Sequence, residues 1–389
     1  MKNSYLVTIL SLLAILVIYI ILFLYTFFNF NNEFDYTFKS FETLNFHKKY
    51  SKNIHHIREE SILNLLFKKP KVEDLLFTTI NNLDKKEMIV LFQGDSWMEQ
   101  ITFSGDNNFI SVKLVQKFKS KKEIGFINAG TASYSPSIMN LQLDVLEKEF
   151  EIFPNIIIAY IDQTDIGDEN CRYKYNKIYK DGVLKSVQPE LYLMYKDLFN
   201  YSQIYGLSEI FLKDASKISK TFQLINFKFE YALKKSTIRF YRKYISNSEI
   251  DKSRLKKCYG KEIVSNLVNP NDREIEYFAD TIREYIEKMN QKKHIEKIFI
   301  VTAPHKKHLY KDAIQDNSYK LNVSDVVDSV LINHKNVTHI NFSKILLNDK
   351  NLNTKDIWLD DTMHFNSNFH GRFFMKKILN ELSKYLKDT

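Results

Sequence analysis

The chain has 389 residues, of which 44% are hydrophobic and 14% aromatic, with only 9 glycines and 6 prolines. This length suits one large domain or two modest ones, and the composition excludes a disordered or repeat-rich polypeptide. The net charge of +9 is unevenly distributed, because residues 171–260 contain 19 Lys/Arg against 8 Asp/Glu.

The N-terminus carries an uncharged apolar run over residues 5–28. As a helix this run spans about 36 Å, which is enough to cross a bilayer. It ends in asparagines and offers no small-residue cleavage site, so we predict a retained anchor over residues 1–30 and not a cleaved signal peptide. Lys2 before the run, with Glu33 and Asp35 after it, favours a cytoplasmic N-terminus. The prediction is a single-pass protein of the cell membrane whose remaining chain is periplasmic or otherwise extracytoplasmic.

Residues 31–86 are polar and irregular and are predicted to form a stalk that leads into the folded domain. Five short apolar runs follow, each rich in β-branched residues or Phe and none alternating cleanly. The runs are Met88–Phe92, Ile124–Asn128, Ile156–Ile161, Ile298–Thr302 and Val337–Asn341. Continuous apolar strands separated by helical segments indicate a parallel sheet covered by helices on both faces. We therefore predict one α/β domain formed by residues 87–170 and 266–389.

About 135 residues separate the third run from the fourth, far more than one crossover helix needs. We predict that residues 171–265 form a basic, aromatic and mostly helical insertion, or cap. Its charge suits anionic lipid head groups or an acidic glycan, and a solvated helical face is the alternative. The predicted location excludes nucleic acid as a partner.

Three helices of the domain are marked by local signals. Ser135-Pro136 predicts a helix start, with an N-cap serine followed by proline at the first helical position. A crossover helix is predicted over residues 270–293, beginning near Asn271. Apolar residues at helical spacing from Phe374 to Tyr385 predict a final helix that closes the sheet.

The tripeptide Gly94-Asp95-Ser96 comes directly after the first predicted strand. A nucleophilic serine needs exposure at the carboxyl end of a strand, with backbone amides free to stabilise an oxyanion. A strand–turn–helix junction supplies both, and ligands of open parallel sheets collect at these strand ends. The tripeptide alone is also ordinary turn chemistry, so it needs a partner elsewhere in the chain.

A second segment, Asp361-Thr362-Met363-His364, precedes the final predicted helix. A serine loses its proton to a base, and histidine is the usual base near neutral pH. A carboxylate three residues earlier on a turn reaches the other ring nitrogen and fixes the tautomer. A surface Asp and His near a helix start is the alternative when this segment is taken alone.

Taken together, the two segments resemble the SGNH hydrolase family, also known as GDSL lipases and esterases. The resemblance covers roughly residues 87–165 and 297–389, and it implies a five-stranded, flavodoxin-like parallel sheet between helices. It also implies that Ser96 is the nucleophile, His364 the base and Asp361 its orienting acid.

Two further family blocks are altered in this chain. The family pattern Asn-x-Gly-x-x-Gly reads Asn128-Ala129-Gly130-Thr131-Ala132-Ser133 here, so Ser133 stands where the second glycine is expected. The pattern Gly-x-Asn-Asp reads Asp162-Gln163-Thr164-Asp165, with Thr164 at the Asn position.

The resemblance implies an oxyanion hole formed by Ser96, Ser133 and Thr164. Supporting roles fall to Asp95, Gly130, Asp162 and Asp165. The hydroxyl of Thr164 donates one hydrogen bond over a shorter reach than an amide, so Gln163 as the donor and an inactive, degenerate member both stay open as alternatives.

The acidic cluster within residues 162–169 lacks a glycine-turned calcium loop, so we predict no metal and no cofactor. The only cysteines, Cys171 and Cys258, bracket the insertion. In an extracytoplasmic domain this arrangement predicts a candidate disulfide at the base of the cap.

The leading interpretation is a membrane-anchored serine esterase or O-acyltransferase that acts on acyl esters of a cell-envelope polysaccharide. The first alternative is a catalytically silent SGNH-like module that binds an anionic glycan or a membrane surface. The second is a lipase acting on membrane lipid.

Overall fold

A computed structural model describes residues 2–28, 49–50, 53–58, 72–84, 86–102, 109–188, 221, 225, 270–305, 321–332, 334, 336–348, 357–358 and 364–388. These residues belong to two units. Unit 1 comprises Met1–Tyr50, Ile62–Val72 and Pro189–Glu249, and unit 2 comprises Ser51–Ser61, Glu73–Gln188 and Ile250–Thr389.

Unit 1 contains α1 (Lys2–Phe28), a single 27-residue helix. Its apolar side chains are exposed, and Val7, Ile15 and Leu16 are each more than half accessible, at 62%, 63% and 53%. Across the part of the chain that the structure describes, no helix reaches the combination of length and hydropathy that crossing a membrane requires.

Unit 2 is built on a six-stranded sheet in the order β1-β3-β2-β4-β7-β8. The strands are β1 (Thr78–Thr79), β2 (Met88–Gln93), β3 (Ile124–Asn128), β4 (Ile156–Tyr160), β7 (Lys297–Thr302) and β8 (Val337–Asn341). All neighbours are parallel except β1, which pairs antiparallel with β3. The five predicted parallel strands are therefore confirmed, in the flavodoxin-like order, and β1 is a short addition that the sequence did not predict.

The central strands lack alternation because helices cover both of their faces. Every residue of β3 and β4 is buried. Val90 and Phe92 of β2 belong to the core cluster shared with the C-terminal helix, whereas Gln93 bonds to Tyr285 on the opposite face. A strand buried on both sides selects apolar residues at consecutive positions.

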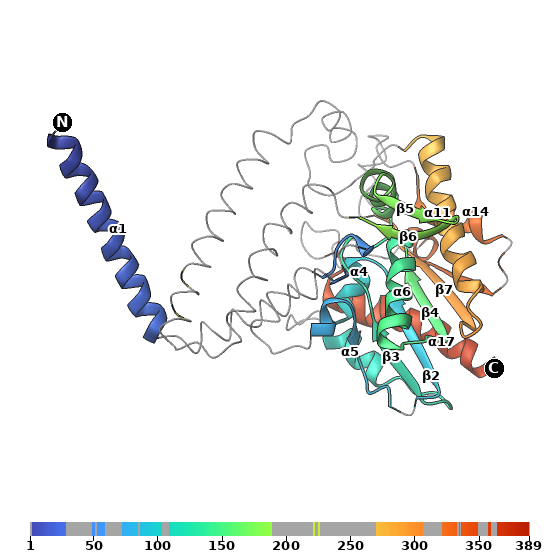
Figure 1. Ribbon diagram of the computed structural model, residues 1–389. Helices are drawn as coiled ribbons and strands as arrows, with labels where there is room; N and C mark the ends of the chain where they lie inside the picture. The colour runs from blue at the N-terminus through green and yellow to red at the C-terminus, as the bar shows by residue number, and fades with distance from the viewer. Residues whose placement is uncertain are drawn as a thin grey trace. The chain divides into compact units, whose positions relative to one another are not determined.

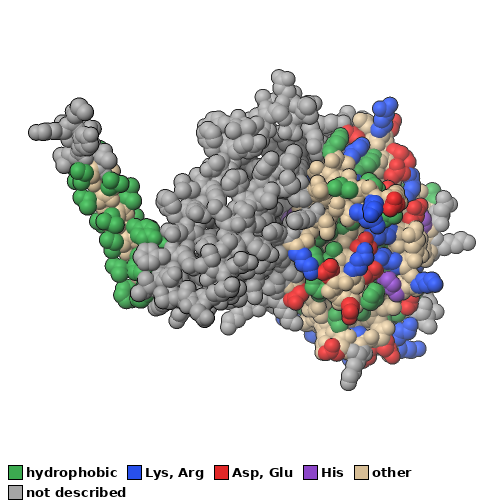
Figure 2. Space-filling model, in the orientation of Figure 1, with side chains coloured by type: hydrophobic (Ala, Val, Ile, Leu, Met, Phe, Trp, Pro, Cys, Tyr) green, Lys and Arg blue, Asp and Glu red, His purple; other side chains and the backbone are tan. Residues whose placement is uncertain are grey.

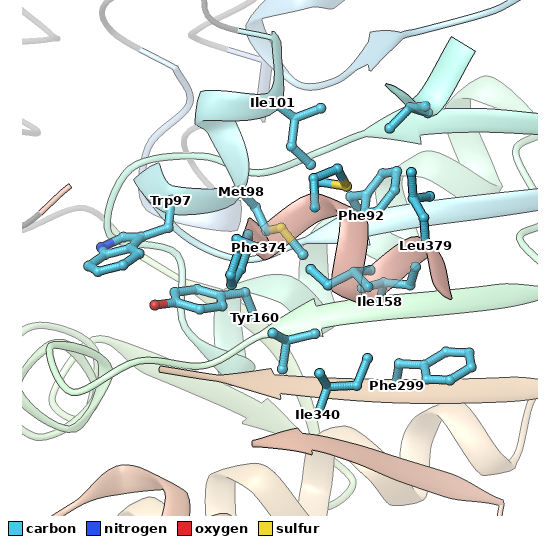
Figure 3. Close-up of a cluster of buried hydrophobic side chains, with 14 of the residues drawn as sticks. Phe92, Trp97, Met98, Ile101, Ile158, Tyr160, Phe299, Ile340, Phe374 and Leu379 are labelled. Atoms are coloured by element: carbon cyan, nitrogen blue, oxygen red, sulfur yellow. The ribbon is translucent and has the colours of Figure 1, made fainter. Parts of the chain in front are cut away.

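Helices lie on the two faces of the sheet (Figure 1). One face carries α6 (Pro136–Phe150), α11 (Asp272–Asn290) and α14 (Val323–Leu331), where α11 packs against both of the others. The other face carries α5 (Phe109–Gln116), the π-helical turn η5 (His370–Met375) and α17 (Lys376–Asp388), which pack on the cluster drawn in Figure 3.

Short elements complete unit 2 around this frame. They are η1 (Val72–Leu75), α4 (Ser96–Glu99), η2 (Gln100–Thr102), α7 (Asp165–Gly167), the π-helical turn η3 (Asp168–Tyr173), α15 (Phe342–Asn348) and α16 (Ser367–Phe369). A two-stranded antiparallel sheet is formed by β5 (Lys177–Lys180) and β6 (Val183–Val187).

Two helix starts follow the sequence signals. The side chain of Asn271 caps α11 in a reciprocal capping box with Glu274. Pro136 opens α6, but the hydroxyl of Ser135 makes no cap and instead donates to Glu169 Oε1 at 2.6 Å. Ser135 therefore stands at the predicted N-cap position of α6, but its side chain bonds to Glu169 in η3 and not to the start of the helix.

Parts of two predicted segments belong to the α/β unit. Within the predicted stalk, Ile54, Ile57 and Leu75 are fully buried, and β1 joins the sheet. The described start of the predicted helical cap contains the end of η3, followed by the β5–β6 hairpin. The remainder of the predicted cap lies outside the described residues apart from Thr221 and Ile225.

Candidate active site

Ser96 is presented by a sharp turn at the carboxyl end of β2. Gly94 has φ +144, and an added Cβ would lie 2.9 Å from Tyr160 Cβ, so both the backbone conformation and the space require glycine. Asp95 then caps α4, because its carboxylate accepts the amide hydrogen of Trp97 at 2.9 Å. Ser96 is the first residue of α4 and stays half-buried.

His364 meets Ser96 at this turn although 268 positions separate them. Its Nε2 lies 2.7 Å from the serine Oγ, a hydrogen-bond distance. The structure thus brings together the predicted nucleophile and the predicted base. Asp361, the predicted orienting acid, lies outside the described residues.

Aromatic packing holds the histidine segment in place. The ring of Phe365 is fully buried and stands edge-on to Trp97 at 4.1 Å between centroids. Trp97 in turn stacks on Tyr160 at 5.4 Å (Figure 3). The side chain of Gln100 donates to the Phe365 carbonyl at 3.2 Å. Trp97, which follows Ser96, and Phe365, which follows His364, are therefore both held in place by packing in the core.

His370, the first residue of η5, supports the turn that carries Ser96. Its Nε2 lies 3.0 Å from the Trp97 carbonyl, and its Nδ1 lies 2.7 Å from Ser111 Oγ. A carbonyl only accepts, so Nε2 carries the hydrogen and Nδ1 accepts from the serine. Burial is the main reason that the pKa of His370 is lowered from 6.5 to about 4.

This shift predicts an acid-sensitive fold. Because the folded-state pKa lies below the unfolded value of 6.5, the contribution of His370 is complete above pH 6.5 and is lost as pH falls from 6.5 toward 4. The loss amounts to about 3 kcal/mol of unfolding free energy. In urea titrations from pH 7 to 4, His370→Gln should show a shallower decline than wild type, although it starts lower. Equal slopes for the two proteins would contradict this assignment.

Ser133 adopts a backbone conformation that favours glycine. Its φ is +63, in the left-handed region, and its side chain is half-buried. The Tyr173 hydroxyl donates to the Ser133 carbonyl, which helps to fix the peptide. The backbone amide of Ser133 is therefore held in a defined loop in spite of the replaced glycine.

Gly130 has a packing role in the same loop. An added Cβ would lie 2.4 Å from the Glu99 backbone nitrogen, so only glycine allows the loop to approach α4. Its amide already donates to Asn128 Oδ1 at 3.0 Å.

Thr164 is placed differently from the expectation. Its hydroxyl donates to Asp162 Oδ1 at 2.7 Å, and its amide donates to the same oxygen at 2.7 Å. A hydroxyl has one hydrogen, so in this structure that hydrogen is used within the loop and is not offered to an oxyanion. The neighbouring Gln163 accepts from the Val323 amide at 3.1 Å, while its buried Nε2 has no hydrogen-bond partner among the described residues.

Three carboxyl groups lie buried behind the nucleophile: Asp95, Asp162 and Asp165. Their oxygen atoms come within 4.8 Å of one another. Asp165 accepts the Asp162 amide hydrogen at 3.1 Å and thereby closes the loop after β4. Burial, followed by the neighbouring carboxylates, raises the pKa of Asp95 and of Asp165 well above the usual range.

A buried arginine that the sequence analysis did not single out organises the Ser133 loop. Arg58 is 3% exposed and donates to the carbonyls of Asn128 and Gly130 at 2.8 and 2.9 Å. Glu99 lies 3.8 Å from Arg58 and accepts the Ala132 amide hydrogen at 3.0 Å. No motif marks either residue, since each acquires its role only through contacts between distant segments.

Cys171 is buried and disulfide-bonded. Cys258, the only other cysteine in the sequence, lies outside the described residues. The candidate pairing of these two cysteines stays a prediction.

Comparisons with known proteins add little to this geometry. No family model matches the sequence, and no curated protein matches it. Among solved structures, the chain is similar to a catalytic mutant of Axe2, an acetylxylan esterase from Geobacillus stearothermophilus, at 11% identity and a TM-score of 0.38, over 76% of this chain and 94% of that one. It is also similar to LAE5, an alpha/beta hydrolase enzyme from the metagenome of Lake Arreo, Spain, at 9% identity and a TM-score of 0.36, over 78% and 96%. TM-scores this low do not establish a shared fold.

Proposed function

We propose that the chain is a serine esterase or O-acyltransferase acting on acyl esters of a cell-envelope glycan. The observation that carries this proposal is the 2.7 Å contact between Ser96 Oγ and His364 Nε2 at the carboxyl edge of the sheet. A histidine at this distance is placed to remove the serine proton while the oxygen attacks an acyl carbonyl. The resemblance to anchored SGNH enzymes, which often act on polysaccharide O-acyl groups, points to the glycan.

The proposed reaction has two steps. Ser96 Oγ bonds to the carbonyl carbon while His364 Nε2 takes the hydroxyl proton, and the amides of Ser96 and Ser133 stabilise the oxyanion. His364 then gives the proton to the leaving alcohol as the acyl C–O bond breaks, which leaves an acyl-enzyme. Water, or a sugar hydroxyl in a transferase, attacks this ester and gives its proton to His364. His364 then returns the proton to Ser96 Oγ as the bond between this oxygen and the acyl carbon breaks, which restores the enzyme. Asp361 is proposed to hold the imidazole tautomer.

An ester panel tests this proposal on the full-length protein in detergent. The panel contains acetylated oligosaccharides, short-chain aryl esters and phospholipids, and free acid and acylated acceptor are both measured. We expect turnover of the acetylated sugars, with transfer to added sugar distinguishing a transferase from a hydrolase. Turnover confined to phospholipid would instead support the lipase alternative.

A silent binding module is the second candidate, and the engaged hydroxyl of Thr164 favours it. Loss of one oxyanion donor raises a barrier by roughly 3 to 4 kcal/mol. A fluorophosphonate probe separates the candidates, because it labels an activated serine without requiring the natural substrate. Folded protein that resists the probe yet binds an anionic glycan would favour the module.

The proposed location is the cell membrane, with residues 5–28 as the anchor, the N-terminus in the cytoplasm and unit 2 in the periplasm. The uncharged run and the exposed apolar side chains of α1 support this proposal. A basic cap that binds anionic lipid or glycan belongs to the same proposal. On the part of unit 2 that is coloured in Figure 2, basic and acidic side chains are intermixed. After an alkaline carbonate wash, the protein should stay in the membrane pellet, and its release would contradict the anchor.

A further inference from the structure

The turn that carries Ser96 and the loop after β4 are joined by acidic side chains. Strands β2 and β4 pair in parallel, with Gln93 opposite Ala159, so the residues that follow each strand emerge side by side. Asp95 and Asp162 are 3% and 4% exposed. Oxygen atoms of both groups, together with one of Asp165, lie within 4.8 Å of one another. Two buried carboxylates this close repel each other, and a proton on one of them removes the repulsion and allows a hydrogen bond between them.

The other hydrogen bonds of the two groups decide where the proton resides. Asp162 Oδ1 accepts from the amide and the hydroxyl of Thr164, both at 2.7 Å, and from the Asp165 amide at 3.3 Å. Asp95 accepts a single hydrogen from the Trp97 amide. Several donors stabilise a charged carboxylate, so Asp162 is the better anion and Asp95 the better acid.

The surroundings of Asp95 also favour its neutral form. The ionisable groups that repel a negative charge on Asp95 are the acidic side chains of Asp162 and Asp168. Asp165 and the phenol of Tyr160 also interact electrostatically with Asp95 and Asp162. All of these side chains are buried.

One basic group of this region pairs with a different carboxylate. Arg172 Nη1 lies 3.3 Å from Asp168 Oδ1. It therefore offsets the charge of Asp168.

We propose that Asp95 is a positioning residue held as a neutral carboxylic acid, whose hydrogen bond to the Asp162 carboxylate fixes the Ser96 turn against the loop after β4. The effect on turnover rests on the proposed function, whereas the protonation itself does not. Ionisation of Asp95 would set two negative charges against each other in a buried site and break the bond.

The sign of the pH dependence follows from the raised pKa of Asp95. Because the folded-state pKa lies above the unfolded value, Asp95 makes its full contribution to the stability of the fold only below the unfolded-state pKa. Its contribution declines as pH rises from the unfolded pKa through the folded one. An asparagine keeps the donor and the acceptor but has no proton to lose.

The test compares Asp95→Asn with Asp162→Asn in the full-length protein between pH 5 and 10. We expect Asp95→Asn to keep kcat/KM within about threefold of wild type near neutral pH, and to melt a few degrees higher at pH 9. The alkaline fall in activity caused by Asp95 should disappear. Asp162→Asn should lose turnover by about 100-fold, because the Thr164 donors then meet a neutral oxygen.

Three results would overturn the proposal. The first is an Asp95→Asn variant whose activity and melting temperature fall at alkaline pH as in wild type. The second is a protein that tolerates asparagine at Asp162 but not at Asp95. The third is a melting temperature that depends on calcium or a chelator in wild type but not in Asp95→Asn, which would put a cation among the carboxylates. Melting temperatures need no substrate. If the proposed esterase function failed, the pH dependence of melting would still decide the protonation state.

Discussion

Replacing Ser96 with alanine should lower kcat by at least about 10⁴-fold while the protein stays folded. The substitution removes the Oγ atom that lies 2.7 Å from His364 Nε2, and no other described hydroxyl occupies that position. His364→Ala should cost a similar factor, because the serine then has no base. The double variant should be hardly slower than either single one, since the two groups act as a unit.

A fluorophosphonate probe and a melting curve check this result together. Wild type should label, and Ser96→Ala should not, at the same melting temperature within error. Ser133→Ala is the matched control, because it removes a half-buried hydroxyl from the neighbouring loop but keeps the backbone amide. Continued labelling of Ser96→Ala would remove Ser96 from the nucleophile role.

The sheet was predictable because its strands are buried on both faces. Such strands appear in the sequence as continuous apolar runs, and no predicted bound differs from the observed one by more than one residue. By contrast, β1 has two residues, too few for any pattern, and it exists only through pairing with β3. The β5–β6 hairpin did have a local signal: Asp181-Gly182, both with positive φ, is typical of a tight hairpin turn.

The meeting of Ser96 and His364 was predictable because parallel topology brings the ends of different strands to one edge. A motif after the first strand and another after the fifth therefore meet whenever the sheet forms. The direction in which the Thr164 hydroxyl donates its hydrogen was not predictable from the sheet topology. Thr164 occupies the expected position, yet its hydrogen goes to Asp162, and only the three-dimensional loop decides between that acceptor and a substrate.

Replacing Arg58 with methionine should reduce the free energy of unfolding by about 3 to 5 kcal/mol. The guanidinium donates to four oxygens: the carbonyls of Asp74 at 2.9 Å, Asn128 at 2.8 Å and Gly130 at 2.9 Å, and Thr78 Oγ1 at 2.8 Å. Methionine fills similar volume but leaves these acceptors unsatisfied and Glu99 buried without its countercharge. Urea titration at neutral pH measures the loss.

Arg58→Lys separates charge from geometry in this site. A lysine keeps the positive charge near Glu99 but has no planar fork to reach several carbonyls at once. We expect it to recover only a small part of the stability lost in Arg58→Met. Full recovery would mean that the ion pair with Glu99, and not the set of carbonyl contacts, stabilises this region.

Activity should follow stability at this position for a structural reason. Arg58 binds the Gly130 carbonyl, and Gly130 begins the loop that carries the Ser133 amide toward the proposed oxyanion. Arg58→Met should therefore lower kcat even at temperatures where the variant is fully folded, with KM little changed, as expected for a contact that matters mainly in the transition state. A variant that is less stable but equally fast when folded would show that the loop holds its shape without the arginine, through its remaining contacts with Glu99, Tyr173 and His56.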